Sequence, residues 1–140
     1  METRVPPVIA QVVLDGTDVR RLAEFYRELL GYHYRPGDEP GAPGADELEW
    51  LVLRGPEGAV QLAFQQVDEL TPTTWPDDAV PVQLHLDCTV PDLEALQHVL
   101  HRARELGAEL RLDRSADPDE PLYVLTDPAG HPFCVFVPAA

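Results

Sequence analysis

The sequence predicts an α+β protein, a single domain spanning its 140 residues and made of two βαβββ modules. Short runs rich in β-branched residues alternate with only two amphipathic helix patterns. The run LDGT at Leu14–Thr17 also recurs as LDCT at Leu86–Thr89, and an Asp that can cap a helix follows each copy. A duplicated module with small insertions accounts for these matches. We therefore expect module one at 8–67, a linker at 68–81 and module two at 82–137.

Module one is expected to begin with a strand at Val8–Leu14, followed by a helix at Val19–Leu30. The helix has an apolar stripe at i, i+3, i+4 and i+7, and Gly31 can end it in a left-handed conformation. The stripe consists of Leu22, Phe25, Tyr26 and Leu29. A loop rich in Pro, Gly and acidic residues at 36–46 then separates a short strand from a hairpin. These three strands are Tyr32–Tyr34, Leu48–Leu53 and Ala59–Val67.

Module two repeats this plan. A strand at Val82–Cys88 leads to Asp92, which can cap a helix from Leu93 to about Leu106, and Gly107 can end that helix. The apolar face of the helix consists of Leu96, Val99, Leu100 and Ala103. Three short strands complete the module, at Ala108–Arg111, Tyr123–Thr126 and Phe133–Val137.

The charge of the chain excludes several functions. It has 25 acidic residues against 10 basic residues, all of them Arg, and its net charge is −15. Such a field repels phosphate backbones, so we expect no nucleic-acid partner. Because the chain contains no Lys, it can form neither a Schiff base nor a P-loop, and it cannot attach pyridoxal phosphate.

The sequence favours a cytoplasmic protein without a membrane partner. No apolar run is long enough to span a bilayer. The N-terminal stretch is interrupted by Pro6 and Pro7 and lacks a signal-peptide pattern. Cys88 and Cys134 lack CxxC spacing, so they are expected to be free thiols.

Alternation along the first strand of each module sorts its side chains into two faces. Leu84 and Leu86 share a face that is expected to pack on a helix, as Val12 and Leu14 do in module one. The opposite faces are polar apart from one valine. They consist of Gln11, Val13 and Asp15 in module one, and of Gln83, His85 and Asp87 in module two. These faces either converge in a shared pocket or are simply wetted by solvent.

His85 is the residue best placed for chemistry, because an imidazole titrates near neutral pH. It can be a catalytic base, a metal ligand or a hydrogen-bond donor to a bound molecule. The alternative is a core histidine fixed by Asp15, Asp87 or Gln83. For Asp15 and Asp87, which lie at strand ends, local hydrogen bonds to the backbone are the commoner role.

Three runs resemble the vicinal oxygen chelate superfamily, which includes glyoxalase I, extradiol dioxygenases, and bleomycin- and fosfomycin-resistance proteins. They are QVVLDGTDVRRLAEFYRELLG at Gln11–Gly31, HLDCTVPDLEAL at His85–Leu96 and DPAGHPFCVF at Asp127–Phe136. The run WPDDAVPVQLHLDCTVPD at Trp75–Asp92 resembles its glyoxalase-like branch in particular. The resemblance implies two βαβββ modules joined into a cupped mixed sheet that binds a divalent metal.

The metal ligands implied by the resemblance fall on Gln11, His85 and Cys134, and the fourth falls near Leu62. Both carboxylates are missing, so Mg²⁺ or Mn²⁺ would lack the oxygen ligands that it prefers. A zinc site of Gln11, His85 and Cys134 is an alternative, because Zn²⁺ accepts nitrogen and sulfur ligands. Two alignments of the modules stay open. The spacing to the helix caps aligns His85 with Gln11, whereas the LDGT repeat aligns His85 with Val13.

Four large aromatic residues outside the helices can line a cavity or fill the core, and Trp75 in the Pro-rich linker suits a pocket rim. Aromatic side chains around polar groups suit a flat or ring-bearing organic ligand. The predicted ligand-binding residues are Gln11, Val13, Asp15, Trp50, Phe64, Trp75, Gln83, His85, Tyr123 and Cys134.

The sequence thus predicts a glyoxalase-like protein that binds a small planar or aromatic organic molecule in the cupped sheet. It would act in resistance or sequestration and use no cofactor. The alternative is a lyase, isomerase or dioxygenase that uses His85 with a divalent metal such as Zn, Ni, Mn or Fe. A homodimer is expected by analogy with the family.

Overall fold

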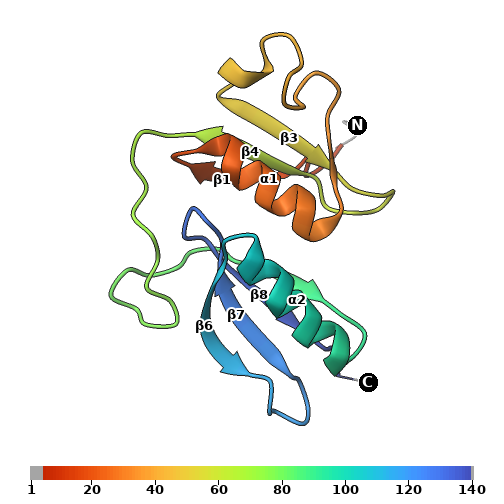
Figure 1. The fold of residues 1–140 in the computed structure, drawn as a ribbon, viewed down its shortest axis with the longest axis vertical. Coiled ribbons are helices and arrows are strands. Elements are labelled where there is room, and N and C mark those ends of the chain that lie inside the picture. The colour runs from red at the N-terminus through yellow and green to blue at the C-terminus, as the bar shows by residue number, and fades with distance from the viewer. Residues whose placement is uncertain (1–4, 140) are drawn as a thin grey trace, which may run out of the picture.

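The computed structural model describes residues 5–139, and Figure 1 shows its ribbon. It confirms the α+β class, with two four-stranded mixed sheets and one α-helix accompanying each. Module one contains β1 (Val12–Gly16), α1 (Val19–Leu30), β2 (His33–Tyr34), a 3₁₀ turn η1 (Ala45–Glu47), β3 (Trp50–Arg54) and β4 (Leu62–Gln66). Its strands lie in the order β1-β4-β3-β2, with β1 parallel to β4 and the other neighbours antiparallel.

Module two has the same topology. It contains β5 (Leu86–Thr89), α2 (Leu93–Glu105), β6 (Glu109–Arg114), β7 (Leu122–Thr126) and β8 (Pro132–Phe136). Its strands lie in the order β5-β8-β7-β6, again with a single parallel pair, β5 and β8. The duplication inferred from the sequence repeats is therefore present in the fold.

The helix boundaries follow the expected capping residues. Asp18 accepts a hydrogen bond from the backbone N–H of Arg21 at 3.2 Å, and Asp92 accepts one from Ala95 at 2.8 Å. Gly31 ends α1 with a φ of 70°, a left-handed conformation that glycine adopts without steric cost.

Aromatic side chains of α1 join the two modules in one core. The ring centroid of Phe133 on β8 lies 5.8 Å from that of Phe25 and 6.1 Å from that of Tyr26. Tyr26 also stacks on Phe64 of β4 at 5.9 Å. All of these rings are buried, so α1 fixes the position of one module against the other.

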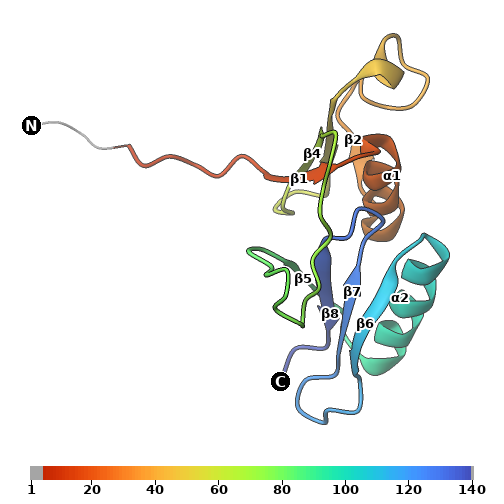
Figure 2. The ribbon, with the colours of Figure 1, turned by 90° about the vertical axis from the view of Figure 1, so that its left-hand side faces the viewer.

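Both helices lie on the same side of the two sheets, and the opposite side carries no helix (Figure 2). Leu86 and Cys88 of β5 pack toward the helices and the core. Strand alternation therefore turns His85 and Asp87 to the opposite side. We call this side, which also bears Val13 and Cys134, the helix-free face.

Several strands begin later than the sequence predicts, including β3 and β4, and the largest shifts are in β1 and β5. β1 starts at Val12 instead of Val8, and β5 starts at Leu86 instead of Val82. The reason is where the partner strands begin. Val12 pairs with Leu62, the first residue of β4, and Leu86 pairs with Phe133, the second residue of β8. The expectation that Leu84 packs on a helix is wrong, since its side chain lies outside the core and is 80% exposed.

Within residues 5–139, no helix is both long enough and apolar enough to cross a membrane.

Candidate functional site

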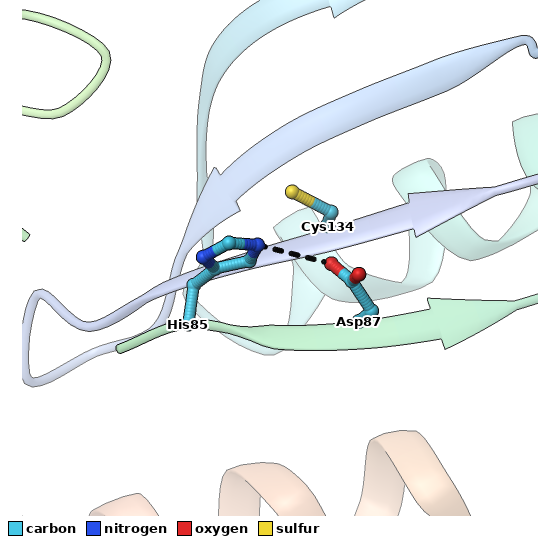
Figure 3. A group of neighbouring side chains, drawn as sticks. All are labelled: His85, Asp87 and Cys134. Atoms are coloured by element: carbon cyan, nitrogen blue, oxygen red, sulfur yellow. Dashed lines mark ion pairs between the residues drawn. The ribbon is translucent and has the colours of Figure 1, made fainter. Parts of the chain in front are cut away.

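Three potential ligand side chains converge on the helix-free face of module two. His85 immediately precedes β5, Asp87 lies on β5, and Cys134 lies on β8, where it is the register partner of Asp87. Their donor atoms all lie within 4.8 Å of one another. Figure 3 shows the His85 ring and the Asp87 carboxylate side by side with the Cys134 sulfur next to them. We call this group the His85 cluster.

The His85 cluster combines two accessible groups with one buried group. His85 Nε2 lies 3.2 Å from Asp87 Oδ1, and both side chains are partly exposed. Cys134 is only 4% exposed. Burial, together with the charge of Asp87 and a hydrogen bond to it, raises the pKa of the Cys134 thiol to about 11. This thiol is therefore neutral at physiological pH, which does not suit a nucleophile.

The second cysteine has a different environment. Cys88 lies on the core side of β5, and burial followed by the charge of Asp87 raises the pKa of its thiol. Both cysteines are free thiols, and only Cys134 reaches the helix-free face.

A cavity of about 420 Å³, which we call the module-two cavity, opens above the cluster. Trp75 forms one wall and stacks on His85, with ring centroids 5.0 Å apart and an interplanar angle of 20°. Apolar side chains of three strands form most of the remaining lining, and Arg114 and Glu120 add charges. The apolar residues are Leu112, Leu122, Val124 and Phe136.

A second cavity of about 480 Å³ lies between the modules and shares His85 with the first. We call it the inter-module cavity. Its walls are β1 from Val12 to Asp15, the linker residues 70–73, and the stretches 80–86 and 129–132. One edge is fixed by a hydrogen bond between His131 Nε2 and the carbonyl oxygen of Asp15 at 2.5 Å. The polar strand faces thus border cavities, as the shared-pocket alternative expects. The structure has two cavities that share His85, whereas a single cup was expected.

The structure distributes the predicted ligand-binding residues over three places. Trp75, His85 and Cys134 line the module-two cavity. Val13, Asp15 and Gln83 line the inter-module cavity together with His85. Gln11 and Trp50 line neither of these cavities.

Phe64 and Tyr123 are corrections to the sequence-based set. Phe64 is completely buried against Tyr26, and Tyr123 is 5% exposed within the same core cluster. Both residues lie on the sheet face that is turned toward the helices, so they stabilise the core and cannot reach a molecule on the helix-free face.

Gln11 is not one of the three residues of the His85 cluster. Its Oε1 accepts a hydrogen bond from Gln61 Nε2 at 2.6 Å. Gln11 and His85 each precede the first residue of the equivalent strand, which favours their equivalence over that of Val13 and His85. By the same comparison of registers, Ala63 occupies the place of Cys134. Module one therefore offers no counterpart of the His85 cluster.

Asp87 is the member of the His85 cluster that the predicted ligand-binding residues omit. Strand alternation places Asp87 on the same face as His85, and this pattern indicates that the two side chains are neighbours. The position of Asp87 at the strand end instead favoured a local hydrogen bond to the backbone. Its place beside Cys134 follows from the register between β5 and β8, which no local pattern reveals.

The donor set of the cluster can be tested for its fit to a divalent metal. An imidazole nitrogen, one carboxylate and one thiol match the ligands of Zn²⁺ and leave a coordination position for another molecule. They do not match Mg²⁺ or Mn²⁺, which prefer several oxygen ligands. Metal binding would have to displace the Cys134 proton, so affinity would increase with pH.

Paired βαβββ modules with polar groups on a shared helix-free face define a vicinal oxygen chelate protein. The model of the glyoxalase-like domain family matches residues 11–136. The chain belongs to this family. No curated protein sequence matches it significantly.

Solved structures support the same fold. A glyoxalase/bleomycin resistance protein/dioxygenase family enzyme from Burkholderia phytofirmans has a TM-score of 0.67 at 16% identity, covering 91% of this chain and 96% of that one. A glyoxalase/dioxygenase from Nostoc punctiforme has a TM-score of 0.66 at 17% identity, covering 100% and 99%. The fosfomycin resistance protein FosX from Mesorhizobium loti has a TM-score of 0.65 at 13% identity, covering 95% and 93%. At these identities the similarity establishes the fold alone.

Proposed function

We propose that the module-two cavity binds a small planar or aromatic organic molecule without a metal, and that the protein acts by sequestration or resistance. The observation that carries this proposal is the stack of Trp75 on His85 at the cavity wall. An indole held in place by a neighbouring ring offers a large, rigid apolar surface at a small cost in side-chain entropy.

The composition of the cavity supports an organic ligand. Its volume of about 420 Å³ lies in the range of small-molecule sites, which combine apolar walls with a few polar groups. Leu112, Val124 and Phe136 provide apolar contacts from three neighbouring strands, while His85 and Arg114 can orient polar substituents. A flat ring system bearing one or two polar groups matches this lining.

The family context is compatible with this role. A fosfomycin resistance protein is among the structures that share this fold, so the fold can serve resistance. The ligand of that protein does not carry over to this chain at 13% identity.

A fluorescence experiment can test this proposal. Trp50 and Trp75 are the two tryptophans, and Trp50 lies outside the module-two cavity, so the Trp50→Phe variant leaves Trp75 as a site-specific probe. We expect aromatic natural products to change its emission and to bind in calorimetry with the same affinity with and without a chelator. The Trp75→Ala variant should lose binding, whereas Trp50→Phe should keep it.

Two results would speak against the proposal. If no member of a broad aromatic panel binds, the cavity has a different role. If binding appears only after a divalent metal is added, the second candidate function takes precedence.

The second candidate is a metal-dependent lyase, isomerase or dioxygenase that uses His85. The observation in its favour is the His85 cluster, whose nitrogen, oxygen and sulfur donors lie within 4.8 Å. His85, Asp87 and Cys134 would hold the ion. A bound Zn²⁺ ion would supply Lewis acidity toward a carbonyl group or a water molecule. Trp75 would then position the substrate from the cavity wall.

Metal binding can be measured without any assay of activity. In the metal-dependent case, protein purified without chelator contains stoichiometric metal, and Co²⁺ gives an intense sulfur-to-metal absorption band. The Cys134→Ser variant loses this band, and the matched Cys88→Ser variant keeps it. Metal-free protein that gives no band with Co²⁺ eliminates this candidate.

We also propose a cytoplasmic location. The support is that Cys88 and Cys134 are both free thiols, a state maintained by reducing compartments. Fractionation of the native host should recover the protein in the cytoplasmic fraction.

A further inference from the structure

We propose that the loop 73–80, which we call the lid loop, moves away from module two as one unit to admit a ligand. This opening would separate Trp75 from His85 and join the two cavities that the pair now divides. The proposal rests on the proposed function only in assigning the open form to ligand entry. The motion itself needs no ligand, so it can be tested apart from ligand binding.

The hydrogen bonds of the lid loop close it on itself. The Thr73 hydroxyl donates to the carbonyl oxygen of Val80 at 3.0 Å, and the backbone N–H of Val80 donates to the Thr74 hydroxyl at 2.8 Å. The carbonyl oxygen of Thr74 also accepts from the N–H of Asp77 at 2.9 Å. Within residues 5–139, no hydrogen bond joins the lid loop to the rest of the chain. The loop therefore keeps its shape without help from the sheets.

The lid loop has little buried contact with the body of the protein. None of residues 68–85 belongs to the hydrophobic core cluster of the described chain. Its aromatic contact with module two is the stack of Trp75 on His85, with ring centroids 5.0 Å apart, and neither ring is fully buried. Segments with few buried apolar contacts are the ones that open locally. Opening of the lid loop must break this stack but no hydrogen bond to the sheets.

Two prolines mark the ends of the lid loop. Pro72 precedes it and packs against the β7–β8 turn, where a Cβ atom on Gly130 would lie 2.7 Å from the Pro72 Cβ atom. Pro81 follows it. A proline ring fixes the φ angle of its own residue, so the change in backbone direction falls on the residues beside it, as at the hinges of other lids. Motion about these two ends displaces Trp75 and leaves the turn at Gly130 in place.

The lid loop and His85 lie between the two cavities. Thr73 and Val80, at the ends of the loop, line the inter-module cavity, whereas Trp75 and Pro76 line the module-two cavity, and His85 lines both. In Figure 2 the green segment between β4 and β5 lies on the helix-free side, beside β5. Withdrawal of Trp75 would connect the volumes of about 480 and 420 Å³. It would also free one face of each ring, so a planar molecule could stack between them.

Fluorine NMR can detect the opening in protein without a ligand. In the Trp50→Phe variant, 5-fluorotryptophan labels Trp75 alone. We expect its resonance to exchange with a minor state on the microsecond-to-millisecond timescale of lids. His85→Ala removes the stack and should raise the population of the minor state roughly two- to tenfold. His98→Ala, which removes an exposed histidine of α2, is the matched control and should leave the exchange unchanged.

Backbone ¹⁵N relaxation dispersion tests whether the loop moves as one unit. The amides of Thr74, Asp77 and Val80 should fit one exchange rate, equal to that of the fluorine label. The Thr74→Val variant removes the hydroxyl that joins the two halves of the loop, so it should split this common rate into several. The turn at 55–58, outside the lid loop, is the internal control, and its amides should not share the rate.

Three results would overturn the proposal. The first is the absence of exchange at Trp75, and the second is an exchange that His85→Ala leaves unchanged. The third is a set of different rates along the wild-type loop, because the loop would then unfold instead of moving as a unit. If the exchange is present but no member of the aromatic panel binds, the lid motion is established and the proposed function is contradicted.

Discussion

The Tyr26 hydroxyl donates a hydrogen bond of 2.6 Å to Asp127 Oδ2, joining helix α1 of module one to the β7–β8 turn of module two. The other oxygen, Oδ1, accepts from the backbone N–H groups of Ala129 and His131 at 2.9 and 3.0 Å. Asp127 is 4% exposed and Tyr26 is 1% exposed. A single buried carboxylate thus connects the modules and shapes the turn that borders the inter-module cavity.

Removing the donor of this hydrogen bond should destabilise the protein. Tyr26→Phe leaves a buried Asp127 oxygen without its partner, which costs about 1–3 kcal/mol. Tyr32→Phe is the matched control, because Tyr32 donates to the carbonyl oxygen of Val60 in an exposed position. Urea unfolding should show a clear loss for Tyr26→Phe and a loss below about 0.5 kcal/mol for Tyr32→Phe. Equal losses would contradict the importance of the connection between modules.

The same carboxylate predicts a pH dependence. Burial raises the pKa of Asp127, although the hydrogen bond from Tyr26 opposes this effect. The folded protein therefore binds the proton more tightly than the unfolded chain, in which the pKa is about 3.9. As the pH rises from that value through the raised pKa, the contribution of Asp127 to the free energy of unfolding falls.

Asp127→Asn isolates this contribution because all other acidic groups remain. The difference in the free energy of unfolding, wild type minus Asp127→Asn, should decrease with increasing pH across this window and then stay constant. Urea titrations at a series of pH values measure it. A difference that increases with pH would mean that the pKa is lowered.

The Cys134 thiol gives a chemical prediction about the His85 cluster. Because its pKa is raised to about 11, partly by Asp87, only a small thiolate fraction reacts at neutral pH. In a Cys88→Ser background, the rate of modification by a disulfide reagent should rise roughly tenfold per pH unit below that pKa. Asp87→Asn should lower the pKa and speed the reaction at pH 8. A slower reaction in Asp87→Asn would show that the Asp87 charge does not govern this thiol.

The fold was predictable because its signals are local. Period-two alternation turned His85 and Asp87 away from the helices, and the positions of Asp18 and Asp92 marked the helix starts. The strand starts were not predictable, since Val8 has strand-forming neighbours but no partner strand opposite it. Pairing depends on where β4 and β8 begin, which the sequence of β1 or β5 does not specify.

The candidate site was predictable only in part, for the same reason. His85 and Cys134 were expected together from the family resemblance, and they do meet. Asp87 joins them through cross-strand register. Phe64 and Tyr123 turn toward the core, and the sequence did not predict this because it left open which face of each strand they occupy. Residues whose role depends on a distant strand are thus the ones that sequence patterns misassign.

Gly130, in the turn after Asp127, offers a prediction that separates backbone strain from crowding. Its φ is 95°, and a Cβ atom there would lie 2.7 Å from Cβ of Pro72 in the linker. Gly130→Ala combines an unfavourable backbone conformation with this close contact, so we expect a loss of about 2–4 kcal/mol. Gly58 has a similar φ of 86°, and a Cβ atom added there would meet no other atom within 4 Å. Gly58→Ala should therefore lose only about 1 kcal/mol. Thermal and urea unfolding of both variants measure the difference, and equal losses would show that the linker moves away from the turn without cost.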